Sequence, residues 1–278
     1  MLTYKYSPSS RTSFFEDRNL RFSQPTALND PQECLPIIED FSADEVVETI
    51  ITRRMSDLLG VLTAKFPGAG PVEIAAIIND AKSKLVENLM QDKAVFSAIA
   101  QQRIRKRMDD VIGILSLSKG WDVGLLWSHY AEAYRGFVVG LDSDSEFFRK
   151  RADEESDIGF LSDVAYMDDL PRVRVEKLKL QKELLYTKRA FWAYECEQRL
   201  VRRLNHGIST AFKDNLGMPV VLFEVPIEAV REITIGFRAP DEVLVGASKL
   251  RASSGGGHIQ LYKASISATS GALERAPV

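Results

Sequence analysis

Apolar positions along the chain follow two periods, which together predict an α+β fold. Alternating runs at residues 2–6 and 19–23 predict strands near the start, each followed by a proline-containing break. Apolar residues at helical spacing predict a short helix at 123–134 and another at 173–187. Further strands are predicted at 114–118, 136–141, 160–167, 196–202, 220–225, 232–237 and 259–264.

A long helical segment interrupts this pattern. Ser42 and Glu45 form a capping box that predicts the start of a helix. Behind it, two apolar stripes follow helical spacing and are separated by the proline- and glycine-rich segment 67–71. The pattern predicts an antiparallel helical hairpin over residues 42–110, inserted into the rest of the chain and packed on itself and the main core.

Outside this insertion, strands and helices are interspersed without regular βαβ repetition. Such a pattern favours a mixed, largely antiparallel sheet with flanking helices over a doubly wound sheet. We therefore expect residues 1–278 to form a single α+β domain. The small, polar residues at 267–278 are expected to form a disordered tail.

Composition and charge argue against several classes of function. The 36 basic and 39 acidic residues leave a net charge of −3, which does not indicate a nucleic-acid partner. No apolar run approaches the ~20 residues of a membrane span, so no membrane partner is predicted. No secretory signal is visible, and the two cysteines, Cys34 and Cys196, suit a reducing compartment, so a cytoplasmic location is expected.

Cofactor chemistry is equally limited. The three histidines and two cysteines form no zinc-binding spacing, so no metal site and no tightly bound cofactor are predicted. Cys196 lies between two glutamates, which disfavour a thiolate, so a cysteine nucleophile is not expected. No serine-nucleophile motif or phosphate loop is present.

Two segments early in the chain combine aromatic and polar groups. Tyr4 and Tyr6 should share one strand face while Lys5 points to the other, and the Asn-Asp-Pro sequence at 29–31 favours an Asx turn. On the predicted helix, Trp127 belongs to an aromatic stripe typical of a core.

Beside this stripe, Ser128, His129 and Tyr130 place hydrogen-bonding groups at the edge of an aromatic patch, which suits a planar polar ligand. The alternative is that these are ordinary core and boundary residues.

A third segment, residues 191–200, carries the strongest signal. If it is a strand, Glu195, Glu197 and Arg199 project to one face, where the carboxylates repel one another and the guanidinium counters this. The segment is then either an exposed, salt-bridged ladder or part of a functional site. The aromatic residues immediately before it, including Tyr194, favour a cleft with an aromatic rim.

These segments resemble the bacterial family called domain of unknown function 2971, whose name carries no activity. The resemblance covers most of the chain outside the helical insertion and implies a bacterial source. It departs at Gln32, where the family usually has an aromatic residue, and at Tyr134, which replaces a common second histidine. The matching motifs are Leu28–Glu33, Ser116–Ser118, Leu126–Ala131, Gly136–Gly140 and Lys188–Arg199.

The order of a Tyr-Lys strand, a His-Tyr helix and a late glutamate is also similar to ADP-ribosyltransferase-like domains. Breaking the nicotinamide–ribose bond develops oxocarbenium character, which a carboxylate stabilises. The similarity implies NAD as a co-substrate, with Glu197 or Glu195 as the catalytic carboxylate. It further implies that Tyr130 or Tyr6 stacks on the ligand, that His129 orients ribose hydroxyls and that Lys5 or Arg199 meets phosphate, with Tyr4, Trp127 and Tyr194 completing the binding site.

The resulting expectation is an NAD-consuming, ADP-ribosyltransferase-like or NAD glycohydrolase-like effector that acts as a toxin or in phage defence and takes a small nucleotide as its partner. The alternative is a non-catalytic ligand-sensing or protein-interaction module, in which the glutamates are exposed or locked to Arg199 and Arg202. A third possibility, a nucleic-acid phosphodiesterase, is raised by the basic runs at 103–107 and 149–151 and requires additional carboxylates to hold a metal. The enzymatic hypothesis requires the late glutamates to meet the His129–Tyr130 helix in one hollow.

Overall fold

The predicted single domain divides into two compact units. The computed structural model describes residues 1–39, 41–149, 158–173 and 182–278. The first unit comprises residues 1–34, 108–170 and 182–278, and the second comprises residues 35–107 and 171–181. The inserted helical segment therefore forms a unit of its own, separate from the sheet-containing unit.

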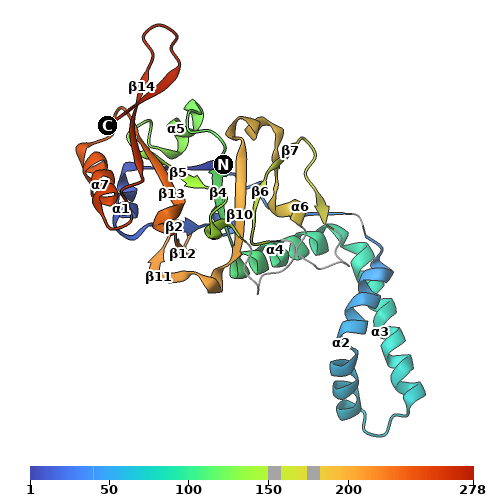
Figure 1. Ribbon diagram of the computed structural model, residues 1–278. Helices are drawn as coiled ribbons and strands as arrows, with labels where there is room; N and C mark the ends of the chain where they lie inside the picture. The colour runs from blue at the N-terminus through green and yellow to red at the C-terminus, as the bar shows by residue number, and fades with distance from the viewer. Residues whose placement is uncertain (40, 150–157, 174–181) are drawn as a thin grey trace. The chain divides into compact units, whose positions relative to one another are not determined.

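An eight-stranded sheet forms the first unit, in the order β15-β14-β13-β5-β1-β4-β10-β6 (Figure 1). The β13–β14 pair is parallel and the other neighbouring pairs are antiparallel, which confirms the predicted mixed, largely antiparallel α+β fold. The strands are β1 Leu2–Ser7, β4 Ile112–Ser118, β5 Phe137–Asp142, β6 Leu161–Asp163, β10 Glu197–Arg203, β13 Val230–Ile235, β14 Gln260–Ile266 and β15 Leu273–Pro277.

Each face of this sheet is covered by its own apolar cluster. Phe137 and Val139 of β5 belong to the cluster beneath helices α1 (Phe14–Asp17) and α7 (Asp241–Ala252), whereas Val138 faces helix α5 (Gly124–Tyr130). This alternation is the period-two pattern expected of a sheet that is covered on both sides. Helix α7 is absent from the elements predicted above.

The end of the chain is ordered, contrary to the predicted disordered tail. β15 pairs with β14 along its whole length. The guanidinium of Arg275 lies 4.5 Å from the ring centroid of Trp121 and 4.2 Å from that of Tyr262, and its Nη1 is 2.5 Å from Glu232. Backbone pairing, stacking and ion pairing hold this strand, with Leu273 as a partly buried apolar contact, and for that reason its largely polar sequence conceals it.

Smaller elements complete the first unit. A three-stranded sheet contains β11 Ile208–Lys213, β12 Pro219–Glu224 and β2 Asn19–Phe22, and β7 Ala165–Met167 pairs with β9 Thr187–Arg189. The remaining helices are α6 Lys182–Leu185 and the 3₁₀ turns η1 Ser9–Arg11, η2 Pro25–Ala27, η3 Glu146–Phe148, η5 Ala190–Glu195, η6 Leu204–His206 and η7 Ile227–Ala229.

The second unit is helical. Ser42 caps helix α2 (Ala43–Lys65) by accepting a hydrogen bond from the Glu45 amide at 3.4 Å, as predicted. The second predicted stripe is divided at Asp92 into α3 (Pro71–Gln91) and α4 (Lys93–Val111), the last turn of which belongs to the first unit. A short parallel pair, β3 Ile37–Ile38 with β8 Arg172–Val173, completes it.

Most of the predicted helix at 173–187 lies outside the described residues, and within them α6 covers only its last turn. Among the described helices, none has the length and apolar character needed to cross a bilayer.

A substitution at Gly136, which precedes β5, would test how closely β1 and β5 approach each other. A β-carbon there would lie 2.0 Å from the Ser7 carbonyl oxygen, whereas one at Gly257 would meet nothing within 4 Å. We expect Gly136→Ala to lower the free energy of unfolding by about 1–3 kcal/mol, since the backbone must shift. Urea unfolding of Gly136→Ala and of the control Gly257→Ala measures this; equal stabilities would contradict it.

Candidate functional site

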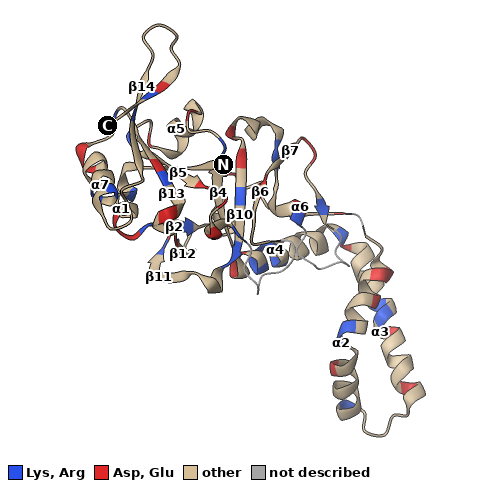
Figure 2. Ribbon diagram, in the orientation of Figure 1, with Lys and Arg blue, Asp and Glu red and all other residues tan. Residues whose placement is uncertain are grey.

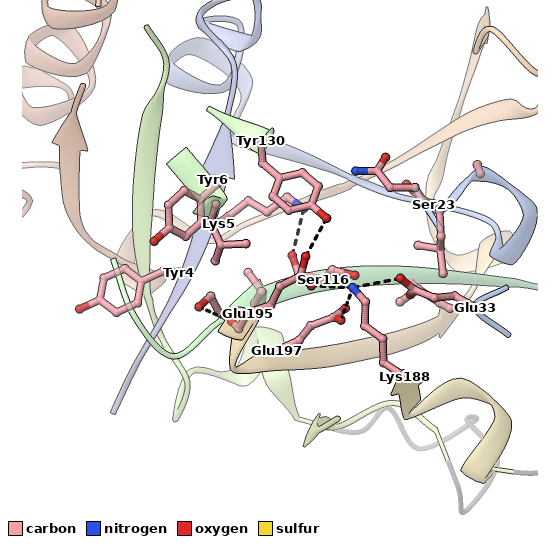
Figure 3. Close-up of a pocket in the computed structure, with 17 residues that line it drawn as sticks. Tyr4, Lys5, Tyr6, Ser23, Glu33, Ser116, Tyr130, Lys188, Glu195 and Glu197 are labelled. Atoms are coloured by element: carbon pink, nitrogen blue, oxygen red, sulfur yellow. Dashed lines mark hydrogen bonds and ion pairs between the residues drawn. The ribbon is translucent and has the colours of Figure 1, made fainter. Parts of the chain in front are cut away.

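A cavity lies where strands β1 and β4 separate. The two strands are paired at one position only, Tyr4 with Ser118, whereas β4 is paired with β10 along its length. Beyond that pair, a cavity of about 180 Å³ is lined by residues of both strands (Figure 3). Its lining is completed by the turn at 27–29, by Ser23, Leu126 and Tyr130, and by the charged residues Glu33, Lys188, Glu195 and Glu197.

The predicted Asx turn delivers Glu33 to this cavity. The Asp30 Oδ1 atom accepts a hydrogen bond from the Gln32 amide at 2.8 Å, which confirms the turn. The indole Nε1 of Trp192 donates to Asp30 Oδ2 at 2.9 Å, so the turn is also anchored to the later aromatic segment. Glu33 then follows as a buried residue, and its amide donates to the Asp30 carbonyl at 3.0 Å.

Glu195 and Glu197 reach the cavity from different elements, so the shared strand face that a strand over 191–200 would give is not formed, whereas the strand predicted at 196–202 is present as β10. Residues 190–195 form the 3₁₀ helix η5, Cys196 adopts a left-handed conformation with φ 44°, and β10 begins only at Glu197. The turn at Cys196 redirects the chain between the two glutamates. Both carboxylates nevertheless line the same cavity, with Arg199 following Glu197 at the i+2 position of β10.

The Lys188 ammonium lies between three buried carboxylates. Its Nζ atom is 2.5 Å from Glu195, 2.9 Å from Glu33 and 3.2 Å from Glu197, and all four side chains are at most 5% exposed. Figure 3 shows the three acidic side chains converging on this lysine. Since each carboxylate contacts the same nitrogen, the three acidic groups lie within two hydrogen-bond lengths of one another.

Arg199 binds two carboxylates of the same cluster. It is completely buried, and its Nε donates to Glu197 at 2.7 Å, its Nη1 to the Leu185 carbonyl at 2.7 Å and its Nη2 to Glu33. Every nitrogen of the guanidinium is therefore engaged within the protein. Arg199 does not line the cavity, so it supports the glutamates and is not placed to meet a phosphate.

These contacts set the ionisation of the cluster. Burial opposes the charge of Glu197, but Arg199 and Lys188 more than compensate and lower its pKa to about 2. Burial likewise opposes the charge of Lys188, yet the surrounding glutamates raise its pKa above the ordinary value. For Glu33, burial outweighs its two cations and raises the pKa. Glu197 is thus ionised at neutral pH and cannot serve as a proton donor.

Tyr130 links helix α5 to the cluster. Its hydroxyl donates to Glu195 Oε1 at 2.9 Å, while Glu195 Oε2 accepts from Lys188. Burial, followed by the charge of Glu195, raises the Tyr130 pKa, so the phenol stays protonated and remains a donor. The late glutamates and the α5 helix therefore do meet in one hollow.

The other aromatic candidates are divided between the cavity and the core. Tyr4 and Tyr6 share an apolar cluster with Trp127, as their alternation with Lys5 predicts, and both tyrosines also line the cavity. Trp127 is completely buried and donates its indole N–H to the Trp121 carbonyl at 2.7 Å, so it is a core residue. Tyr194 packs against the same apolar cluster.

Neither Trp127 nor Tyr194 is among the residues that line the cavity. His129 is exposed and does not line the cavity either. The helical geometry explains this, because consecutive residues of α5 point in different directions and Tyr130 takes the inward position.

Lys5 is the second lysine of the cavity and differs sharply from Lys188. Its Nζ donates to the Ser116 carbonyl oxygen at 3.0 Å, across the gap between β1 and β4. Desolvation, only partly opposed by Glu197, lowers its pKa to about 8. Of the two cations expected to meet a phosphate, Lys5 is the one that lines the cavity.

Glu33, Lys188 and Ser116 were not among the predicted site residues. All three lie inside the motifs of the suggested family, at the end of the turn, at the start of the Lys188–Arg199 block and in the Ser-Leu-Ser strand. Their common destination depends on strand pairing between segments far apart in the sequence, which local spacing does not reveal.

The cluster does not have the arrangement of a metal site. Within the described part of the chain, no group of three or more His, Cys, Asp or Glu residues is arranged to hold a metal ion. The three converging glutamates surround the Lys188 ammonium instead. Arg202, an expected partner of the glutamates in the non-catalytic alternative, donates to the Phe147 carbonyl.

Comparison of the chain with protein-family models, with curated proteins and with solved structures gives no significant match. Its resemblance to domain of unknown function 2971 stays a prediction.

Removing the charge of Glu197 should destabilise the protein. Glu197→Gln leaves the buried Arg199 and Lys188 without a partner that each now has, which typically costs about 3–5 kcal/mol. The exposed Glu228 supplies a control, Glu228→Gln, with an expected change within about 0.5 kcal/mol. Urea unfolding at pH 7 measures both, and equal stabilities would show that the ion pairs contribute nothing net.

The stabilisation by Glu197 should also depend on pH. Its folded-state pKa of about 2 lies below the ordinary 4.5, so the contribution is complete above pH 4.5 and is lost as the pH falls through 2. We expect the stability difference between wild type and Glu197→Gln to shrink by about 3 kcal/mol over this interval. Urea unfolding at several pH values tests it, and a difference that is constant with pH would be the contrary result.

Proposed function

We propose that this chain is an NAD-consuming enzyme that breaks the nicotinamide–ribose bond, as an ADP-ribosyltransferase or an NAD glycohydrolase does. The observation that carries the proposal is the hydrogen bond between Tyr130 and Glu195 on the wall of the cavity. It brings a carboxylate, an aromatic ring and a hydroxyl donor together at one small hollow. These are the groups required to hold a flat, polar ring beside a developing cation.

Charge balance supports this chemistry. The three carboxylates of the cluster exceed its ion-paired cations, Lys188 and Arg199, by one charge. Lys5 offsets this excess only while it is protonated, up to a pKa of about 8. Above that pH the cluster carries one uncompensated negative charge, which would stabilise a positive charge that develops on the ribose anomeric carbon.

Glu195 is the better candidate for the catalytic carboxylate. Glu197 is bound by Arg199 and by Lys188 and is fixed in position. Glu195 accepts one hydrogen bond from the cavity residue Tyr130 and one from Lys188. In the proposed step, nicotinamide leaves with the bonding electron pair, Glu195 stabilises the resulting oxocarbenium ion, and water or an acceptor hydroxyl attacks it. Glu197 then acts as a positioning residue.

The ring-binding role falls to Tyr130, which lines the cavity and supplies the aromatic surface for nicotinamide. Tyr4 and Tyr6 also line the cavity, but their rings pack into the apolar cluster on the other face of β1. His129 has no part in this proposal because its side chain lies outside the lining of the cavity.

A second function is favoured by a different observation. Glu197, Lys188 and Arg199 form a closed, buried network in which each charge is already paired. Such a network suits a rigid, non-catalytic module that senses a small ligand in the same cavity. The two functions differ in one measurable property, which is turnover.

The test is release of nicotinamide from NAD, measured by chromatography. We expect turnover by the wild type and a loss of about 100-fold or more in Glu195→Gln, because the stabilising charge is removed. This variant should also be less stable than the wild type, because Lys188 loses the carboxylate that lies 2.5 Å from its Nζ atom, so turnover is compared at a temperature at which circular dichroism shows both proteins folded. Tyr130→Phe should lose about 10-fold, the worth of one hydrogen bond to a charged group.

Glu228→Gln serves as the matched control and should keep full activity. Wild-type protein that NAD stabilises against heat without releasing nicotinamide would favour the sensing module. Full activity in Glu195→Gln would remove its catalytic role, and absence of both binding and turnover would overturn both functions.

A further inference from the structure

The two lysines of the cavity have opposite environments. Lys188 is surrounded by three carboxylates, whereas Lys5 makes a single hydrogen bond, to the Ser116 carbonyl, and no ion pair within 4 Å among the described residues. Lys5 is also only partly buried, while Lys188 is 3% exposed. Lys188 is therefore held in place by its carboxylates. The Lys5 amine lines the cavity, has no ion pair among the described residues and can react with a ligand.

We propose that Lys5 is a nucleophilic amine that forms an imine with a small hydroxylated aldehyde or ketone bound in the cavity. The ligand class follows from the groups that surround it. Ser116 and the carboxylate of Glu195 line the cavity and offer hydrogen-bond partners for hydroxyl groups, and the cavity volume of about 180 Å³ suits a molecule of a few carbons. This inference goes beyond NAD cleavage and does not depend on it.

Imine formation requires only the amine and the carbonyl compound. The lone pair of the neutral amine attacks the carbonyl carbon, a C–N bond forms, and the C–O bond then breaks. The oxygen leaves as water with the two hydrogens that the amine carried, so no oxidant, reductant or metal is needed. The resulting C=N bond is reversible by hydrolysis.

The groups facing Lys5 favour its neutral form. Desolvation has the largest effect, Arg11 and Arg21 act in the same direction, and Glu197 and Glu195 oppose them. These charges come from η1, β2, β10 and η5. With a pKa of about 8, Lys5 carries on the order of a hundredfold more neutral amine at pH 7.5 than an ordinary exposed lysine.

The test is reductive trapping on the wild-type protein. Incubation with D-glyceraldehyde and cyanoborohydride converts an imine to a stable secondary amine, which peptide mass mapping locates. We expect Lys5 to be labelled at least 10-fold faster than the exposed Lys249, with a rate that rises as the pH passes through about 8. Labelling of Lys5 no faster than that of Lys249 would overturn the proposal.

Two variants separate site from background. Lys5→Arg should lose the fast phase of labelling, and Lys249→Arg should retain it. If Lys5→Arg does not fold, the mapping of the wild type still decides the question. Because no NAD is present, failure of trapping bears on Lys5 alone, whereas failure of the wild type to release nicotinamide bears on the proposed function alone.

Discussion

The ammonium group of Lys188 keeps three carboxylates together in a place that water scarcely reaches. Without it, Glu33, Glu195 and Glu197 would repel one another, and burial would drive them towards protonation. Arg199 closes the cluster from the core side and supplies the second charge. The turn before Glu33, the 3₁₀ helix η5 and strand β10 are all tied to this one centre, so the wall of the cavity is held rigid.

The cavity itself follows from a local failure of strand pairing. β1 stays paired with β5, and β4 stays paired with β10, so the two strands share only the Tyr4–Ser118 position. The space between them is bounded by polar groups that a continuous sheet would have covered. Lys5 reaches across the gap to a backbone oxygen, and Tyr130 closes the opposite side by binding Glu195 (Figure 3).

Charge is distributed unevenly between the two parts of this site. Glu197 is paired with two cations, whereas Glu195 is held by one cation and by Tyr130. Lys5 lines the same cavity and makes no ion pair among the described residues. Across the ribbon, acidic and basic residues are intermixed, in keeping with the small net charge (Figure 2). The site is therefore set by a few buried contacts and not by the overall field of the protein.

Local chemistry made several features predictable. The cap at Ser42, the Asx turn at Asp30 and the opposite directions of Lys5 and its two tyrosines each depend on residues next to one another in the chain, and the structure has all three. Predictions failed where a non-local contact dominates. β15 is held by Arg275 between two aromatic rings, and Glu195 leaves the expected strand because the chain turns at Cys196.

Periodicity and turn chemistry act over a few residues, so the amino-acid pattern was enough to predict the fold class, most of the strands and the acidic segment that ends in Arg199. The folded chain was needed to show that Glu33 and Lys188 join Glu195 and Glu197, and that Tyr130 points inward in place of His129. Buried charges pair with the opposite charges that lie nearest to them in space. Those distances depend on strand pairing and on the rotation of a helix about its axis, and neither can be read from the spacing of residues along the chain.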